Sequence, residues 1–191
     1  MIRGFALLPY FVAAVLVTGC SGSDATQAQE SAIERYGIPW VLEDDGRYAL
    51  RADIAVDAPA ATVWNLVRDV NHYGDWSQAL TAHVETLEAG APIDLAIQLL
   101  PPPAPKTKSR ELIQVVDDEV LAISWTREFP FDQRTERWQL VVPEGSHACR
   151  YYTALVFTQG LGSIMKVTFG PPTLAAFEAF AVELAAEATG S

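Results

Sequence analysis

Two arginines are the side chains of this sequence best suited to hold an anion beside apolar residues. Arg137 and Arg150 lie among aromatic residues, and a guanidinium can bind a carboxylate or a phosphate head group through two parallel hydrogen bonds. The alternation of a strand places Arg137 on the face opposite Trp138, and Arg150 on the same face as Tyr152. Exposed cross-strand ion pairs explain the same pattern, and we favour that alternative.

No pattern of residues in the sequence predicts catalysis or metal binding. The histidines His72, His83 and His147 lie on three separate segments, without the short spacing of metal ligands. A Gly-x-Ser-x-Gly nucleophile motif is missing, and Gly160-Leu161-Gly162-Ser163 lacks the length and context of a phosphate-binding loop. We therefore expect no metal site and no cofactor, and we assign no catalytic residue.

A strand that leads directly into a helix begins the folded part of the chain. Apolar residues at every second position of residues 48–56 indicate a half-buried strand. Asp57 is expected to cap the helix that follows, with Pro59 in its first turn. The apolar face of that helix consists of Val63, Trp64 and Val67.

Alternating segments separated by turn residues fill the middle of the chain. Further strands are predicted over residues 80–88, 93–100, 109–116, 120–127, 135–142 and 148–158. Short connections between them favour antiparallel hairpins. Gly170-Pro171-Pro172 is expected to interrupt any earlier helix, so that a final amphipathic helix runs over residues 173–188.

The opening motif resembles the START-like superfamily, also called SRPBCC or the polyketide cyclase/dehydrase and lipid transport group. The resemblance is carried by Asp57-Ala58-Pro59, Val63-Trp64, Asp69 and Tyr73-Gly74-Asp75-Trp76, and it covers residues 46–189. It implies an α+β helix-grip fold, a curved antiparallel sheet of about seven strands wrapped around a long C-terminal helix. Because this fold serves lipid carriers, hormone receptors, aromatase/cyclases and chaperone activators, the fold does not name the function.

The resemblance also implies a ligand pocket between the sheet and the final helix. Large apolar side chains in the predicted strands and helices are the candidates for its lining, and as a group they imply an apolar ligand. Ordinary core packing is the alternative for each of them. These candidates are Trp76, Trp125, Phe129, Phe131, Trp138, Tyr152, Phe157, Met165, Phe169 and Phe177.

The first residues predict export and lipid attachment. Arg3 precedes an apolar stretch over residues 5–17, which is too short to span a bilayer, and Val17-Thr18-Gly19-Cys20 resembles a bacterial lipobox. We expect residues 1–19 to be a lipoprotein signal peptide and Cys20 to be acylated, with residues 20–45 as a flexible tether and lead-in. An ordinary secretory signal with a chance cysteine, or an uncleaved anchor, is the alternative. The expected location is the cell envelope, at the periplasmic face of the outer membrane in preference to the inner membrane.

The charge composition of the sequence limits which kinds of partner the protein can bind. The sequence has 13 Lys and Arg against 24 Asp and Glu, a formal net charge of -11, which disfavours binding to nucleic acid or to anionic lipid head groups. Acylation of Cys20 would leave Cys149 without a disulfide partner, so we interpret Cys149 as a buried apolar residue.

These observations favour a membrane-anchored lipoprotein whose START-like domain binds a hydrophobic or amphipathic small molecule, such as a lipid. One alternative is a cell-envelope interaction module without an open cavity, and another is a cyclase/dehydrase-type enzyme, for which no acid or base can be assigned. A cavity of roughly 300 Å³ or more separates binding from the collapsed module. The sequence leaves the ligand's identity and the oligomeric state open.

Overall fold

The computed structural model describes residues 23–38, 49–130, 133–157 and 162–191. The predicted signal peptide, the acylation site Cys20 and the pocket candidate Phe131 lie outside these ranges. For residues 162–169 the helical backbone is described but the side chains are not, so the placement of the Met165 and Phe169 side chains stays a prediction.

Seven antiparallel strands form a single sheet, which confirms the expected α+β architecture. Each strand pairs with its neighbours in the order β1-β7-β6-β5-β4-β3-β2, so the first strand lies beside the last. Consecutive strands from β2 to β7 pair antiparallel, as the predicted hairpins require. The strands are β1 (Ala49–Val56), β2 (Leu80–His83), β3 (Pro92–Ile97), β4 (Thr107–Asp117), β5 (Ala122–Phe129), β6 (Gln133–Pro143) and β7 (Cys149–Phe157).

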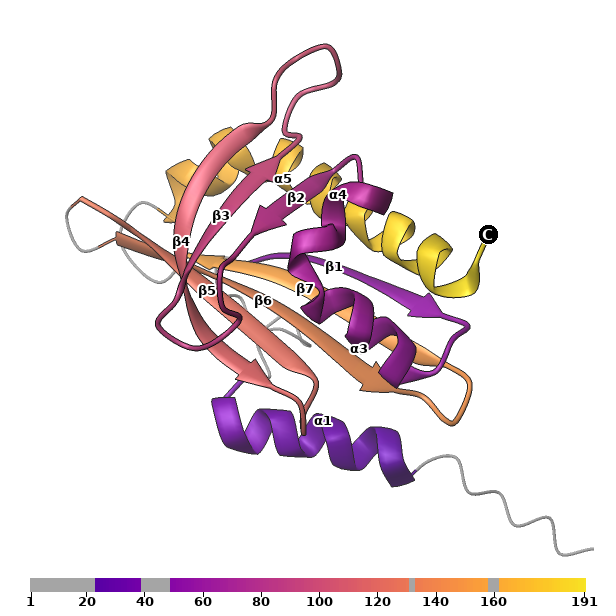
Figure 1. Ribbon diagram of the computed structural model, residues 1–191. Helices are drawn as coiled ribbons and strands as arrows, with labels where there is room; N and C mark the ends of the chain where they lie inside the picture. Colours follow the sequence, from indigo (N-terminus) through magenta and orange to yellow (C-terminus); the bar gives the residue numbers. More distant parts are fainter. Residues whose placement is uncertain (1–22, 39–48, 131–132, 158–161) are drawn as a thin grey trace, which may run out of the picture.

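Helices cover both faces of this sheet (Figure 1). The long C-terminal helix α5 (Gly162–Thr189) lies across the concave face, together with α3 (Ala60–Arg68) and a short segment formed by η1 (Val70–His72) and α4 (Tyr73–Trp76). Helix α1 (Ser23–Tyr36) packs on the opposite face against β6. None of the described helices is both long and apolar enough to cross a membrane.

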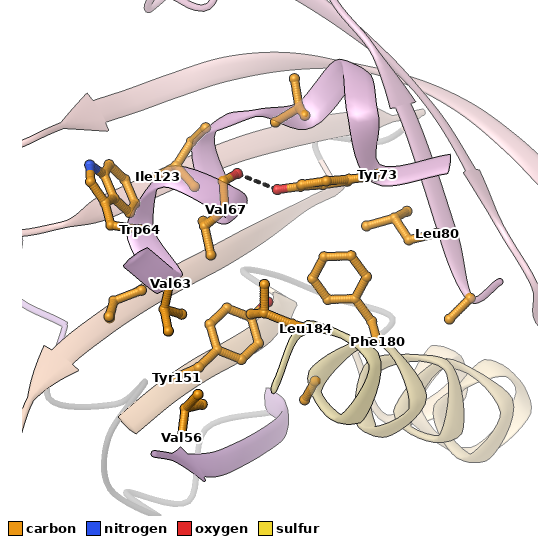
Figure 2. Close-up of a cluster of buried hydrophobic side chains, with 14 of the residues drawn as sticks. Val56, Val63, Trp64, Val67, Tyr73, Leu80, Ile123, Tyr151, Phe180 and Leu184 are labelled. Carbon is orange, nitrogen blue, oxygen red and sulfur yellow. Dashed lines mark hydrogen bonds between the residues drawn. The ribbon is translucent and has the colours of Figure 1, made fainter. Parts of the chain in front are cut away.

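Helix α3 follows β1 as predicted, but its first turn differs from the expectation. The helix starts at Ala60 with Pro59 in the cap position, so Asp57 is not the cap. Val63, Trp64 and Val67 are all buried, which confirms the predicted apolar face. Figure 2 shows Val63 and Val67 on the side of α3 that faces Leu184 of α5, and Trp64 on the side nearer Ile123.

Helix α5 is longer than predicted, because Pro171 and Pro172 lie inside it rather than at its start. A proline removes one backbone hydrogen bond and can bend a helix without ending it. The C-terminal half of α5 seals its end of the concave face with Phe180, Ala181 and Leu184, each at most 1% exposed. Glu183 of the same half accepts hydrogen bonds from the Ser77 hydroxyl at 2.6 Å and from the backbone N–H groups of Gln78 and Ala79.

Helix α1 corrects part of the expected flexible tether and lead-in, because residues 23–36 of the predicted range 20–45 form a helix. Ala32 is fully buried against the sheet, and the ring of Tyr36 lies 5.6 Å from that of Trp138. Arg35 binds Asp117 at 2.7 Å and Glu119 at 2.8 Å. The small polar residues that indicated a tether are compatible with a helix, and the few apolar ones suffice to attach it to the sheet.

Candidate functional site

A cavity of about 280 Å³ lies between the concave face of the sheet and the part of α5 that precedes Phe180. It forms beyond the point where Phe180 and Leu184 fill the space between α5 and the sheet. Five neighbouring strands contribute every second residue to its wall, since alternate side chains of a strand share one face. The described lining is Leu95, Ile97, Leu99, Thr107, Ser109, Glu111, Arg127, Phe129, Thr135, Arg137, Leu155, Phe157, Thr173 and Phe177.

Most of this wall is apolar. Leu95 and Ile97 come from β3, Leu155 and Phe157 from β7, and Phe177 from α5. These residues can bury the hydrocarbon of a ligand, and each square ångström of apolar surface removed from water stabilises a complex by about 25 cal/mol before the cost of association. The polar lining residues lie mainly on three neighbouring strands: Thr107, Ser109 and Glu111 on β4, Arg127 on β5, and Thr135 and Arg137 on β6, with Thr173 on α5.

Arg137 is the buried charge of the cavity. Its side chain is 2% exposed, and its Nε, Nη1 and Nη2 atoms make no hydrogen bond to the described residues. The guanidinium carbon lies 4.2 Å from the centre of the Phe177 ring and 5.4 Å from that of Trp125. Burial lowers the pKa of Arg137, while the nearby Tyr151 raises it. An arginine keeps its proton at any ordinary pH, so the cavity contains a positive charge.

A chain of hydrogen bonds runs from the neighbourhood of Arg137 to helix α3. The Tyr151 hydroxyl donates to the Gln139 amide oxygen, and the Gln139 amide nitrogen donates to the Tyr73 hydroxyl at 3.2 Å. The Tyr73 hydroxyl donates in turn to the Val67 carbonyl (Figure 2). Burial raises the pKa of Tyr151 to about 12, so the phenol stays neutral. The chain holds Tyr151 in place but leaves the guanidinium without a hydrogen-bonded partner.

Glu111 is the acidic group of the described cavity wall. Its carboxylate accepts a hydrogen bond from the Ser109 hydroxyl at 2.7 Å. Burial raises the pKa of Glu111, and the Ser109 bond together with the positive charges of Arg137 and Arg127 opposes that shift only in part. Glu111 makes no ion pair within 4 Å of Arg137, so it does not neutralise the guanidinium at short range.

The comparison with protein families decides what kind of domain surrounds this cavity. The family model described as polyketide cyclase/dehydrase and lipid transport matches residues 48–189. This chain belongs to the polyketide cyclase/dehydrase and lipid transport family. The START-like resemblance of the opening motif is thereby confirmed. A comparison with curated protein sequences found no match.

Solved structures show the fold of this family in distant relatives. A protein from Thermus thermophilus is 19% identical with a TM-score of 0.58, and the match covers 74% of this chain and 97% of that one. The Zhui aromatase/cyclase from a Streptomyces species is 13% identical with a TM-score of 0.58, covering 74% and 93% of the two chains. A START superfamily protein from Mycobacterium smegmatis is 14% identical with a TM-score of 0.53, covering 74% and 97%. At these identities the likeness establishes the helix-grip fold of the family, and not a shared ligand.

Four predicted site residues lie in the wall of this cavity. Phe129, Phe157 and Phe177 contribute aromatic surface, and Arg137 contributes the charge. Trp125 is fully buried beside Arg137 but belongs to the core that borders the cavity.

Four predicted site residues lie elsewhere in this family domain. Trp76 packs on Tyr73 and Phe180 in the sealed part of the core. Trp138 and Tyr152 point to the opposite face of the sheet, where helix α1 covers them. Arg150 shares that face and forms ion pairs with Asp53 and Glu144, both at 2.8 Å. The expected cross-strand ion pairs are therefore correct for Arg150 and wrong for Arg137.

Sequence reasoning missed most of the cavity wall because it selected residues by aromatic character. The pairs Arg127 and Phe129, Thr135 and Arg137, and Leu155 and Phe157 are each two positions apart, and this spacing places each pair on one face. The same rule excludes Trp138, because Arg137 and Trp138 are adjacent and must face opposite sides. The alternation of side chains along each strand was thus the signal that could have identified the residues of the cavity wall.

The remaining reactive side chains lie apart from the cavity. Cys149 is a free, fully buried thiol whose pKa burial raises to about 11, so it is not a nucleophile. His72 is exposed and binds Asp69 at 2.7 Å, and this contact raises its pKa. Within the described ranges no cluster of three or more His, Cys, Asp or Glu residues could hold a metal ion.

Proposed function

We propose that this protein is a membrane-anchored lipoprotein whose START-like domain binds a compact hydrophobic or amphipathic small molecule in the cavity between the sheet and α5. The observation that carries the proposal is the cavity itself, whose wall is apolar over β3 and β7 and at Phe177 of α5, and mainly polar over β4 to β6. Such a wall can hold a molecule with an apolar body and one polar end. Family membership supports a ligand-binding domain of this kind.

The volume of the cavity limits the size of the ligand. At about 280 Å³ it falls slightly short of the roughly 300 Å³ expected to separate binding from a collapsed module, so the proposal rests on the lining of the cavity and not on its volume. A single ring system or one short chain suits this volume, whereas a whole two-chain phospholipid does not. The ligand class we propose is therefore a compact molecule, which can include a single-chain lipid.

Lipid attachment at Cys20 would place this cavity close to a membrane. Only residues 21 and 22 separate Cys20 from the first residue of helix α1, which is packed on the sheet. Several acyl chains make such an anchor durable, since each buried methylene contributes about 0.8 kcal/mol. A domain held this way would meet molecules that partition into the bilayer. The expected location of the anchored protein is the periplasmic face of the outer membrane.

Native mass spectrometry tests the binding proposal. The fragment should cover residues 21–191, because a start near Ser31 would divide helix α1. Purified from its own host, it is expected to carry a small molecule in one-to-one ratio, which denaturation releases for identification. A mass equal to that of the bare chain, with no thermal stabilisation by any lipid or aromatic compound added, would contradict the proposal.

Acylation is tested separately in the host. Growth with an alkyne-tagged fatty acid should label the full-length protein, and the Cys20→Ala variant should remain unlabelled and leave the membrane fraction. Separation of the two membranes on a density gradient then gives the location. Equal labelling of both forms would contradict attachment at Cys20.

A further inference from the structure

The cavity contains a positive charge that forms no ion pair within 4 Å with the described residues. All three nitrogens of Arg137 are buried and make no hydrogen bond to the described residues. Its side chain comes from β6, near the middle of the sheet, and is only 2% exposed. A buried charge without a partner is costly, so proteins that retain one generally pair it with a ligand, a metal or another charge.

The groups packed around the guanidinium cannot replace such a counterion. Phe177 and Trp125 offer their ring faces, which attract a cation but accept no hydrogen bond of ordinary strength. The Tyr151 hydroxyl lies near the guanidinium and raises its pKa, but a neutral phenol has no negative charge to balance it. Glu111 faces the same cavity, but burial raises its pKa and its oxygen is already bonded to Ser109.

We propose that the ligand of this cavity is a compact carboxylic acid and that Arg137 binds its carboxylate. This inference rests on the proposed binding function and names the chemical class of the ligand. A carboxylate can accept two parallel hydrogen bonds from the free nitrogens of the guanidinium. The hydrocarbon of the acid then lies along Leu155, Phe157 and Leu95, on the apolar part of the wall.

A carboxylate fits this site better than a phosphate ester. A single negative charge balances the single unpaired guanidinium, whereas a second charge would lie near the Glu111 carboxylate without a further free donor of the same burial. Arg127 also lines the cavity, but its side chain is only half-buried, so water can solvate its guanidinium. The cavity therefore has one buried anion position.

Calorimetric titration of residues 21–191 with sodium decanoate and with 1-decanol tests the inference. The two probes share a hydrocarbon chain and differ in charge. We expect decanoate to bind about tenfold or more tightly than decanol, which corresponds to one charge-assisted hydrogen-bonded contact. Arg137→Met should abolish that preference while retaining decanol binding. Arg150→Gln removes an arginine from the opposite face and should leave the preference unchanged.

Three results would overturn the inference while leaving the proposed function intact. These are equal binding of decanol and decanoate, an undiminished preference in Arg137→Met, and tighter binding of decyl phosphate than of decanoate. If neither decanoate nor decanol binds to the wild-type protein, the cavity function fails together with the inference. Circular dichroism verifies that Arg137→Met is folded, and Arg137→Lys, which retains the charge, should retain part of the preference.

Discussion

The guanidinium carbon of Arg137, on strand β6, lies 4.2 Å from the centre of the Phe177 ring, on helix α5. The positive charge of the arginine therefore contacts the face of an aromatic ring. A cation over an aromatic face is stabilised by about 0.5–2 kcal/mol, more when both groups are desolvated. That contact offsets only part of the cost of burying the charge. The pair therefore holds a buried charge in position at the expense of stability.

Replacing Arg137 should make the empty protein more stable. Arg137→Met retains much of the side-chain volume and removes the uncompensated buried charge, so we expect the free energy of unfolding to rise by about 1–4 kcal/mol. Urea unfolding of ligand-free protein measures the change. Arg150→Met, which breaks exposed ion pairs, should give no such increase. A lower stability of Arg137→Met would show that the native guanidinium is already compensated.

Gln139 links two buried tyrosines, and its loss should be costly. Gln139→Leu leaves the hydroxyls of Tyr73 and Tyr151 without their amide partner in the core, so the free energy of unfolding should fall by about 1–3 kcal/mol. Thermal unfolding provides the measurement. Gln114→Leu introduces the same change at an exposed position of β4 and should alter stability little. Equal effects of the two substitutions would argue against the buried hydrogen-bond chain.

Glu183 attaches helix α5 to residues 77–79, which directly precede β2. Glu183→Ala removes the acceptor for the Ser77 hydroxyl and for two backbone N–H groups, so we expect a loss of about 1.5–3 kcal/mol. Glu187→Ala is the matched control, since that carboxylate is exposed on the same helix. Chemical denaturation of both variants tests the difference. Comparable losses would mean that the contacts of Glu183 do not set the effect, because alanine favours a helix more than glutamate does.

The stability of the empty protein should respond to pH through Glu111. Burial raises the folded-state pKa of this carboxyl above its unfolded value, so its protonated form favours folding below the unfolded pKa. That contribution is lost as pH rises through the folded pKa. Glu111→Gln cannot ionise and should unfold at a higher temperature than the wild type at pH 7. The difference should shrink at pH 4, and a constant difference across this range would contradict the assignment.

Helix α1 should detach when its buried face is made charged. Ala32→Asp places a carboxylate at a fully buried position, so amide hydrogens of residues 23–36 should exchange faster with deuterium. Glu34→Asp changes an exposed position of the same helix and serves as the control. The sheet itself should remain protected in both variants. Unchanged exchange in Ala32→Asp would mean that α1 does not depend on this contact.

The architecture could be predicted from the sequence because the periodicity of apolar residues in each segment matches the strand or helix that the segment forms. Alternation located all seven strands, and the buried face of α3 followed from Val63, Trp64 and Val67. Helix α1 escaped prediction because its contacts are non-local: Tyr36 meets Trp138, and Arg35 meets Asp117, across the whole domain. No local pattern contains those pairings.

The candidate site was only partly predictable, for a different reason. Alternation along a strand determines which face of the sheet a side chain occupies. The place where α5 stops packing directly on the sheet depends on the three-dimensional packing of the helix. Trp76 and Phe177 are both large and apolar, yet Trp76 lies in the sealed core and Phe177 lines the cavity. The alternation of the strand allows Arg137 to point toward the cavity. Only the three-dimensional structure shows that its guanidinium makes no hydrogen bond to the described residues.

The pairing of β1 with β7 also determines when this domain can fold. Ala49 lies opposite Val156 and Val56 opposite Cys149, so the first strand acquires its neighbour only after the last strand has been made. Contacts between such distant parts of a chain slow folding, and an unpaired strand edge can recruit other chains. A chain that stops before β7 would leave β1 without its partner. Synthesis must therefore be nearly complete before the fold can close, and unfinished chains are the ones at risk of aggregation.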